Sequence, residues 1–486
     1  MKLTRHLAGY LPANIASALA SFGAVYVFTR LLGAEEYGRY ALMLSVMALI
    51  HTLTLSPGEA AAYRYTGQAR TRGQQALSDH FATVQAVLLR SLVLAAVAMI
   101  ILALAVSQLP SYLGILPWVA VLLPLNTLIQ ATLEAHRASQ QVPRYVLVFS
   151  FRLLAGFGLG AVIAWLTGLG AAAPFAGLTL AALIVAIPQL SWLMRAARGG
   201  TASPERIRAY YAYGLPIAAA LSLDILLSVA DRFLISLFLG EAAVGAYAAG
   251  YGVADKTILL LCAWAAMAGA PLVLAAFEED GPEAASAQAR SLVSTILFIG
   301  VPAVTGLALV AEPLAEALIG EDVREGATRI IPWIAFAGLM NGLLMHYYSE
   351  VFQLAQKTGE QALLMLIPAG VNIAANLLLI PSLGIIGAVI ATIVSYALGI
   401  LIIALRGRRY IAFPFPVWPA LKIGLAALAM WPATAFIPEF GSWAELICKA
   451  AAGAVVYAAA ALLLDAGGAR SFVQDRLSKS DSAHET

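Results

Sequence analysis

The sequence has little charge for its length. Only 12% of its 486 residues are Asp, Glu, Lys or Arg, whereas soluble globular chains average about 25%. Hydrophobic residues make up 61% of the chain. This composition excludes an ordinary water-soluble domain. The formal net charge of +2 says little about partners by itself, and no nucleic-acid partner is expected.

Residues that carry redox, metal or nucleotide chemistry are also scarce. The two cysteines, Cys262 and Cys448, lie far apart in apolar stretches, which argues against a disulfide framework and against a metal site. The sequence contains no Gly-x4-Gly-Lys-Ser/Thr phosphate loop, so direct use of ATP is not expected. We therefore predict no metal and no cofactor, with H⁺ or Na⁺ as the candidate coupling ion.

Long apolar runs fill most of the chain. Each is long enough for a helix to cross a hydrocarbon core about 30 Å thick. They predict an all-α polytopic membrane protein with about 14 transmembrane helices, at residues 7–29, 39–61, 81–106, 114–135, 145–167, 173–194, 211–237, 245–272, 291–311, 329–352, 361–380, 383–405, 418–437 and 444–464. The first run is longer than the apolar part of a secretory signal, so it is interpreted as a retained span.

Basic residues are distributed unevenly between the two ends of these spans. With the N-terminus placed in the cytoplasm, about twenty Lys and Arg fall on the cytoplasmic side, against three on the other: Arg39, Arg324 and Arg329. Cytoplasmic loops typically carry such an excess. An even number of spans then predicts that both termini are cytoplasmic.

The chain repeats its own beginning. Motifs around the seventh span echo motifs around the first: Leu215-Pro216, Leu239-Gly240 and Gly245-x-Tyr247 match Leu11-Pro12, Leu32-Gly33 and Gly38-x-Tyr40. After spans four and ten, Glu134 and Gln140 likewise match Glu350 and Gln356. Because six spans return the chain to its starting side, these motifs predict two parallel six-helix repeats.

The repeats predict four parts. These are an N-terminal six-helix lobe (1–205), a C-terminal six-helix lobe (206–405), transmembrane helices 13 and 14 as a C-terminal helix pair (406–465), and a cytoplasmic tail (466–486). Transporters built from two similar units place the substrate route at the interface of the repeats. We therefore expect a route between the two lobes.

Three stretches are distinctive within this frame: TRLLGAEEYGRYALM at 29–43, DRFLISLFLGEAAVGAYAAGY at 231–251 and NLLLIPSLGIIGAVIATIVSY at 376–396. They resemble the polysaccharide-transporter branch of the multidrug/oligosaccharidyl-lipid/polysaccharide exporter (MOP) superfamily, over roughly residues 1–405. The resemblance implies a flippase of the bacterial inner membrane and not an enzyme. Such proteins move an undecaprenyl-pyrophosphate-linked oligosaccharide from the cytoplasmic to the periplasmic leaflet by alternating access, for export of cell-surface polysaccharide.

The expected partners are a polyprenyl-pyrophosphate-linked glycan, the lipid bilayer and the polysaccharide polymerase machinery, with the protein itself a monomer. Three other functions stay open: a lipid II or other lipid-sugar flippase, a multidrug or cation antiporter, and a membrane glycan polymerase or ligase. A polymerase or ligase is expected to have a substantial periplasmic loop. The largest one here, AEPLAEALIGEDVREGATRI, is about twenty residues long, which disfavours that function.

Arginines within the spans are the candidate head-group site. Guanidinium groups stay charged and bind phosphate oxygens bidentately, so they suit a pyrophosphate. Arg90 in span three and Arg152 in span five lie about 10–15 Å past the predicted cytoplasmic boundary, while Arg30 and Arg64 lie at the ends of spans one and two. The alternative is snorkelling of these long side chains to the head groups, which is favoured for Arg30 and Arg64.

Acids within the spans of the second half are the candidate coupling site. Asp224 in span seven and Asp255 in span eight are predicted near the membrane midplane, where a charge costs about 2.5–3.5 kcal/mol on insertion scales. Either carboxylate is a candidate for binding H⁺ or Na⁺. The alternative is a structural pairing with Lys256, which is also a candidate for the head-group site. Asp231 and Arg232 are interpreted as the end of span seven.

Polar residues complete the list of candidates. Asn372 and Asn376, one turn apart in span eleven, suit hydrogen bonds to sugar hydroxyls, although intramembrane Asn more often joins helices. Glu134 and Glu350, near the cytoplasmic ends of spans four and ten, are candidates for gate contacts with basic loops.

Overall fold

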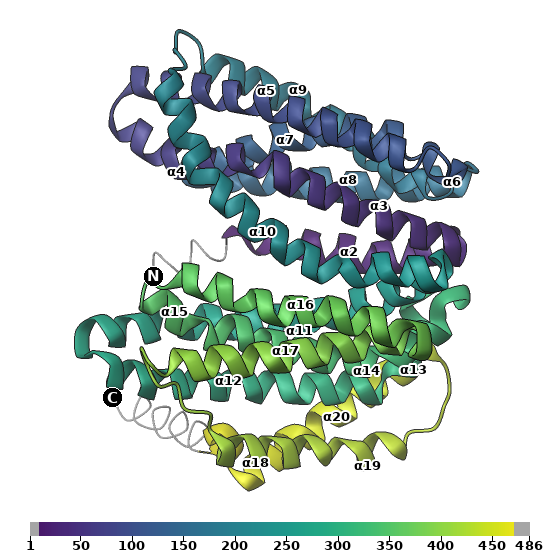
Figure 1. Cartoon of the computed structure of the whole chain (residues 1–486). Helices are drawn as coiled ribbons and strands as arrows, with labels where there is room; N and C mark the ends of the chain where they lie inside the picture. Colours follow the sequence, from purple (N-terminus) through teal and green to yellow (C-terminus); the bar gives the residue numbers. More distant parts are fainter. Residues whose placement is uncertain (1–8, 471–486) are drawn as a thin grey trace, which may run out of the picture. The chain divides into compact units, whose positions relative to one another are not determined.

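The computed structural model describes residues 9–470, except for the side chains of residues 220, 223, 224, 226–228 and 442. The described chain is built from helices, with no strand among those residues (Figure 1). In this described part of the chain, eleven helices are long and apolar enough to cross a membrane, or twelve if the bent pair α3–α4 counts as one span. The prediction of an all-α polytopic membrane protein is therefore confirmed.

All fourteen predicted spans coincide with helices. The two predicted spans not among the eleven or twelve correspond to α10 (Pro204–Leu239) and to the broken pair α18 (Val417–Leu428) and α19 (Met430–Ala435). The count of fourteen stays a prediction.

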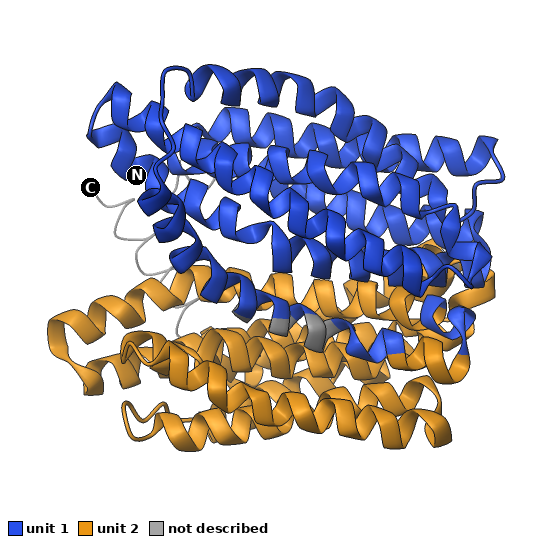
Figure 2. Ribbon diagram, turned by 45° about the horizontal axis from the view of Figure 1, so that its top comes forward, with its two compact units in different colours: residues 1–233, 240–245 blue, residues 234–239, 246–486 orange. Residues whose placement is uncertain are grey.

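The helices divide into two compact units (Figure 2). Unit 1 comprises residues up to Phe233 together with 240–245, and unit 2 comprises 234–239 and the chain from Ala246. Unit 1 contains most of α10 and the helices α2 (Leu11–Leu31), α3 (Gly33–Thr54), α4 (Ser56–Thr71), α5 (Gln74–Ala105), α6 (Pro110–Leu113), α7 (Leu116–Ala138), α8 (Val142–Leu166) and α9 (Ala172–Ala196).

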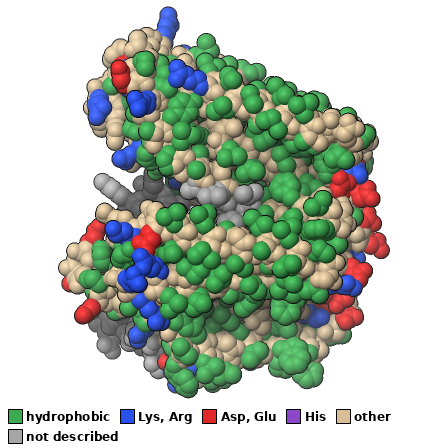
Figure 3. Space-filling view, viewed as in Figure 1, with side chains coloured by type: hydrophobic (Ala, Val, Ile, Leu, Met, Phe, Trp, Pro, Cys, Tyr) green, Lys and Arg blue, Asp and Glu red, His purple; other side chains and the backbone are tan. Residues whose placement is uncertain are grey.

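Apart from residues 234–239 of α10, unit 2 begins within the first turns of α11 (Glu241–Asp280). Its other helices are α12 (Pro282–Leu309), α13 (Ala311–Leu318), α14 (Glu321–Leu343), η1 (Leu344–Tyr348), α15 (Glu350–Leu354), α16 (Thr358–Leu383), α17 (Ile385–Gly407), α18, α19, α20 (Ser442–Leu464) and η2 (Ala466–Gly468). Broad apolar surface covers the long sides of the helices in both units, and charged side chains gather toward helix ends (Figure 3). Such surfaces suit a lipid environment.

Glycines with positive φ lie at the starts of corresponding helices. Gly33, the first residue of α3, and Gly240, before α11, have φ of 71° and 84°, and Gly73 before α5 and Gly281 before α12 have φ of 101° and 86°. These left-handed conformations stop the preceding segment and favour glycine, which has no Cβ to clash. The Gly33–Gly240 match is one of the sequence repeats.

The repeat pair Gln140 and Gln356 also shares a backbone conformation. Their φ values are 57° and 55°, uncommon for residues with a side chain. Each ends a helix with the same two hydrogen bonds. The N–H of the residue after each glutamine donates to the backbone carbonyl five residues before it, at 2.9 Å after Gln140 and 2.8 Å after Gln356. The N–H of each glutamine itself donates to the backbone carbonyl three residues before it. This is a Schellman motif, and its occurrence at both positions is what the predicted duplication requires.

The first turns of α10 pack within unit 1. Tyr210 stacks on Tyr65 of α4, with ring centroids 4.5 Å apart, and its hydroxyl lies 2.6 Å from His80 Nδ1 on α5. Arg206 forms an ion pair with Asp79 at 3.1 Å. The compact unit therefore continues past the predicted lobe boundary at 205/206. That boundary marks a sequence repeat and stays a prediction.

Candidate functional site

Arg152 lies in the polar interior of unit 1. It is half-buried on α8, a helix that packs against α2, α7 and α9. Its Nη1 donates to Asn126 Oδ1 on α7 at 3.0 Å. Glu59 on α4 is the carboxylate whose charge acts most strongly on Arg152. A guanidinium has five N–H donors, so this arrangement orients the group and leaves further donors to bind an anion.

Glu59 is paired across a bend in the second predicted span. The α3 and α4 axes meet at 53°, and Leu55, Ser56, Pro57 and Gly58 at the bend are buried. Pro57 has no N–H to donate, which helps to break the helix there. His51 Nε2, before the bend, lies 2.8 Å from Glu59 Oε1, after it.

The His51–Glu59 pair was not predicted from the sequence. In a straight helix, residues eight apart are separated by about 12 Å along the axis, so only the bend brings them together. The Pro57-Gly58 dipeptide inside an apolar run was the available signal.

Glu134 lies at the end of the same interior. It is half-buried on α7, 3.4 Å from Arg137 on the next turn, and the charge of Glu59 also acts on it. We call His51, Glu59, Asn126, Glu134 and Arg152 the unit 1 polar cluster. It contains the predicted residues Arg152 and Glu134.

The other predicted arginines are placed differently. Arg90 is exposed and lies one turn from Leu94, which is 54% exposed on the same face of α5. Arg30 is exposed, donates to the Tyr26 carbonyl at 2.9 Å, and covers that ring at 4.0 Å. Arg64 is exposed near Tyr213, 5.9 Å from its ring. These placements favour the snorkelling interpretation, including for Arg90.

Within the described part of unit 2, the predicted candidates are Asp255, Lys256, Asn372, Asn376 and Glu350. Asp255 is buried on α11 beside Gly338 of α14, where an added Cβ would lie 3.5 Å from Asp255 Oδ1. Lys256, the next residue, is exposed. Asp255 therefore remains the candidate for a buried carboxylate site.

Asn372 and Asn376 pair with each other. Asn376 Nδ2 donates to Asn372 Oδ1 at 3.0 Å on α16, and both side chains are buried, which favours a packing role. Glu350 is half-buried at the start of α15, and its predicted gate role stays a prediction.

The acids of α10 separate into two cases. Asp224 lies outside the residues whose side chains the structure describes. Asp231 is 3% exposed, and its Oδ1 accepts from the Arg232 backbone N–H at 2.7 Å. Arg232 Nη1 donates to Ser45 of α3 at 3.1 Å. The pair thus joins α10 to α3 inside unit 1.

A second cluster of polar side chains lies at the starts of α3 and α11. It was not predicted from the sequence. Arg39 Nε contacts Glu241 Oε2 at 2.7 Å, and the Tyr112 hydroxyl donates to Glu241 Oε1 at 2.7 Å. Glu36 also contacts Arg39 and accepts from the Ala171 N–H at 2.7 Å. Arg39 and Glu241 are 202 residues apart, so no local pattern predicts their contact.

Two repeat-equivalent glycines form a helix crossing beside this cluster. A Cβ on Gly38 would overlap the Glu241 carbonyl and lie 3.1 Å from Gly245 N, and a Cβ on Gly245 would overlap the Ala34 carbonyl. The Gly-x4-Gly-x-Tyr motif thus supplies glycine where the starts of α3 and α11 touch backbone to backbone. Small residues allow such close crossings in membrane helices.

An apolar groove lies on unit 1, and one of its lining residues, Phe151, directly precedes Arg152. It encloses about 580 Å³, and α2 and α8 line it. Its exposed walls include Ile15 and Leu19 of α2 and Leu147 and Phe151 of α8. Because Phe151 directly precedes Arg152, α8 carries a wall of the apolar groove and a guanidinium on neighbouring faces of one turn. Such a pairing can accommodate an amphiphile with an anionic head. Among the described residues, no group of three or more His, Cys, Asp or Glu could hold a metal ion.

The comparisons with known proteins concern family and fold. The family model described as "Polysaccharide biosynthesis protein" matches residues 27–326, and no curated protein matches the chain. The lipid II flippase MurJ, in an inward closed conformation, has a TM-score of 0.70 at 14% identity, over 93% of this chain and 98% of that chain.

Two further solved structures are transporters of the MOP superfamily. An inward-facing multidrug resistance MATE transporter has a TM-score of 0.57 at 15% identity, over 82% of this chain and 97% of that chain. A MOP transporter from Pyrococcus furiosus Vc1 has a TM-score of 0.52 at 16% identity, over 84% and 95%. The fold of this chain is similar to that of transporters of the MOP superfamily. The chain belongs to the family described as polysaccharide biosynthesis protein, as its motifs predict.

Proposed function

We propose that this protein is a flippase that moves an undecaprenyl-pyrophosphate-linked oligosaccharide across the bacterial inner membrane, from the cytoplasmic to the periplasmic leaflet, for polysaccharide export. The observation that carries the proposal is Arg152 on α8, directly after Phe151, which lines the apolar groove of α2 and α8. The guanidinium suits the pyrophosphate, and the groove suits the polyprenyl chain. The family match supports a role in polysaccharide biosynthesis.

In this scheme both termini are cytoplasmic, and the protein acts on a glycan that polymerase machinery then extends. The Glu59 charge acts on Arg152, and the Asn126 contact fixes one of its donors. An anion entering the cluster would therefore compete with Glu59 for the guanidinium. That competition provides a way to release the cargo as well as to bind it.

A lipid II flippase is the second candidate. The likeness in fold to MurJ, with a TM-score of 0.70, favours it over a drug antiporter. Both flippase cargoes share a polyprenyl pyrophosphate, so the unit 1 polar cluster would meet the same group in each. Their sugars differ, and competition between the two lipids distinguishes the candidates.

The test is flipping by purified protein in proteoliposomes. A fluorescent polyprenyl-pyrophosphate oligosaccharide is reconstituted, and its exposure to a membrane-impermeant quencher is followed over time. Hydrogen bonds to charged groups contribute about 1.5–3 kcal/mol, so Arg152→Ala is expected to slow flipping about 10- to 100-fold. Arg90→Ala, at similar depth on the exposed face of α5, is the matched control and should stay near the wild-type rate.

Arg152→Lys separates charge from geometry, since it keeps the cation and loses the bidentate donors. An intermediate rate is expected. Wild-type flipping by Arg152→Ala would remove Arg152 from the cargo site. The flippase proposal itself would be overturned if the wild-type protein did not flip the lipid and instead transported a drug across the liposome membrane.

A further inference from the structure

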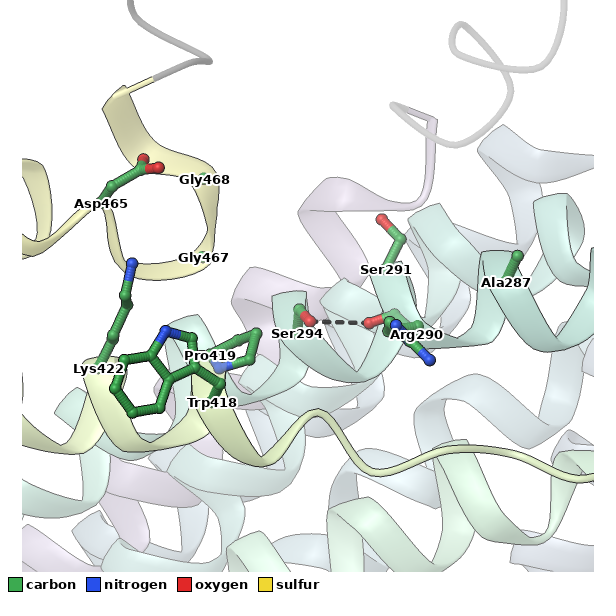
Figure 4. Close-up of a pocket in the computed structure, with 10 residues that line it drawn as sticks. All are labelled: Ala287, Arg290, Ser291, Ser294, Trp418, Pro419, Lys422, Asp465, Gly467 and Gly468. Carbon is green, nitrogen blue, oxygen red and sulfur yellow. Dashed lines mark hydrogen bonds between the residues drawn. The ribbon is translucent and has the colours of Figure 1, made fainter.

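A pocket in unit 2 is separate from everything assigned above. It encloses about 370 Å³. Three segments line it: α12 through Arg290 and Ser294, α18 through Trp418 and Lys422, and the turn after α20 through Asp465 and Gly467 (Figure 4). None of these residues belongs to the unit 1 polar cluster, so the pocket requires its own explanation.

The turn after α20 is fixed in place by the fold. Gly467 has φ of 60°, and a Cβ there would lie 2.9 Å from the Phe298 ring of α12. Tyr457 on α20 donates to the Phe298 carbonyl at 2.7 Å. The turn is therefore packed against α12, and the pocket between them is part of the folded unit.

Charge in the pocket favours an anion. Arg290 and Lys422 supply two cations, and Asp465 supplies one carboxylate, whose Oδ1 already accepts from the Arg470 backbone N–H at 3.0 Å. Within residues 9–470, no ion pair within 4.0 Å joins Asp465 to either cation. Lys422 extends from α18 toward the turn in Figure 4. The pocket thus keeps a net positive charge.

The surroundings of the pocket indicate a membrane surface. Trp418 is 66% exposed, and Leu421 and Leu425, farther along α18, are each 50% exposed. Tryptophan at a helix end with apolar side chains beyond it is typical of the interface between head groups and acyl chains. The distribution of Lys and Arg predicts that the side of the membrane on which the pocket lies is cytoplasmic. Basic pockets between helices on that side bind the head groups of anionic lipids.

We propose that this pocket binds the phosphate head group of an anionic phospholipid from the inner leaflet. Arg290 and Lys422 face the phosphate oxygens, and the exposed leucines of α18 contact the acyl chains. Trp418 lies at the boundary between them. The site depends on the membrane location of the chain and not on its proposed cargo.

The test measures lipid binding to the purified full-length protein by native mass spectrometry. Phosphatidylglycerol and phosphatidylcholine with identical acyl chains are titrated in separate samples. The wild-type protein is expected to retain phosphatidylglycerol at least tenfold more tightly. Each basic residue near an anionic lipid contributes about a fivefold effect, so Arg290→Gln with Lys422→Gln should weaken phosphatidylglycerol binding about 30-fold.

The matched control removes two cations outside the pocket, through Arg198→Gln with Lys357→Gln. Both residues are exposed and predicted on the same face, and their loss should change binding less than twofold. Equal retention of the two lipids by the wild-type protein would overturn the proposal, as would equal losses in the two double variants. Displacement of phosphatidylglycerol by millimolar inorganic phosphate would assign the pocket to soluble phosphate and overturn the lipid source. The single variants Arg290→Gln and Lys422→Gln, each expected to lose about fivefold, test the same charges if the double variant does not fold.

Discussion

The two units share their helix ends and differ in their polar interiors. Gln140 and Gln356 end helices with the same left-handed turn, and Gly33 and Gly240, at the starts of α3 and α11, share a positive φ. Unit 1 nevertheless contains the arginine, histidine and carboxylates of its polar cluster. Unit 2 contains Asp255 and an asparagine pair. A shared frame therefore supports different polar interiors, an arginine with carboxylates in unit 1 and a buried Asp255 with an asparagine pair in unit 2.

The largest expected effect tests the shared frame at the glycine crossing. Gly38→Ala and Gly245→Ala each place a Cβ onto a backbone carbonyl of the other helix. Such overpacking costs about 1–3 kcal/mol or more, so both variants should lower the apparent unfolding temperature of the purified protein by similar amounts. Gly158→Ala is the control, because nothing lies within 4 Å of its Cβ position. A large loss in only one of the crossing variants would contradict the equivalence.

The next effect tests the difference between the units. If Asp255 binds the coupling ion, Asp255→Asn should abolish the response of flipping to a pH or sodium gradient and leave downhill flipping measurable. Asp280→Asn, at the exposed end of the same helix, is the control and should respond like the wild type. The same measurement on Asp224→Asn tests the other predicted acid. A full response by Asp255→Asn would make Asp255 structural.

The smallest effect is expected at the left-handed turns of Gln140 and Gln356, which have the same backbone conformation. Gln140→Gly and Gln356→Gly remove the cost of holding a side chain in a left-handed conformation, about 1–2 kcal/mol, and add flexibility to the unfolded chain, which offsets about 0.5–1 kcal/mol. A similar small gain in thermal stability is expected for both. Gln141→Gly, next to the turn, should give no gain. Opposite signs for Gln140→Gly and Gln356→Gly would show that the two turns carry different strain.

The sequence predicted the frame because its signals are local. Apolar runs mark the spans, and prolines and glycines mark helix ends, so the helices follow from short windows of residues. Arg90 and Arg152 could not be told apart in this way. Both lie at similar depth, and only the neighbours of each helix decide that Arg152 meets Asn126 while Arg90 joins an exposed apolar face.

The remaining site residues depend on distant or bent geometry. His51 and Glu59 meet only because the helix bends by 53° between them. Arg39 and Glu241 meet across 202 residues of sequence. Neither arrangement leaves a periodic pattern, so sequence periodicity alone does not reveal it.

The bend between α3 and α4 has a mechanical consequence. A break in a membrane helix frees backbone groups that lipid does not solvate, and here the residues at the break are all buried in protein, with Leu55 at 0% exposure. The angle can therefore change without moving those groups into hydrocarbon. The break is suited to act as a hinge inside unit 1. A change in the angle between α3 and α4 would change the distance between His51 and Glu59, so their contact would form or break with the motion.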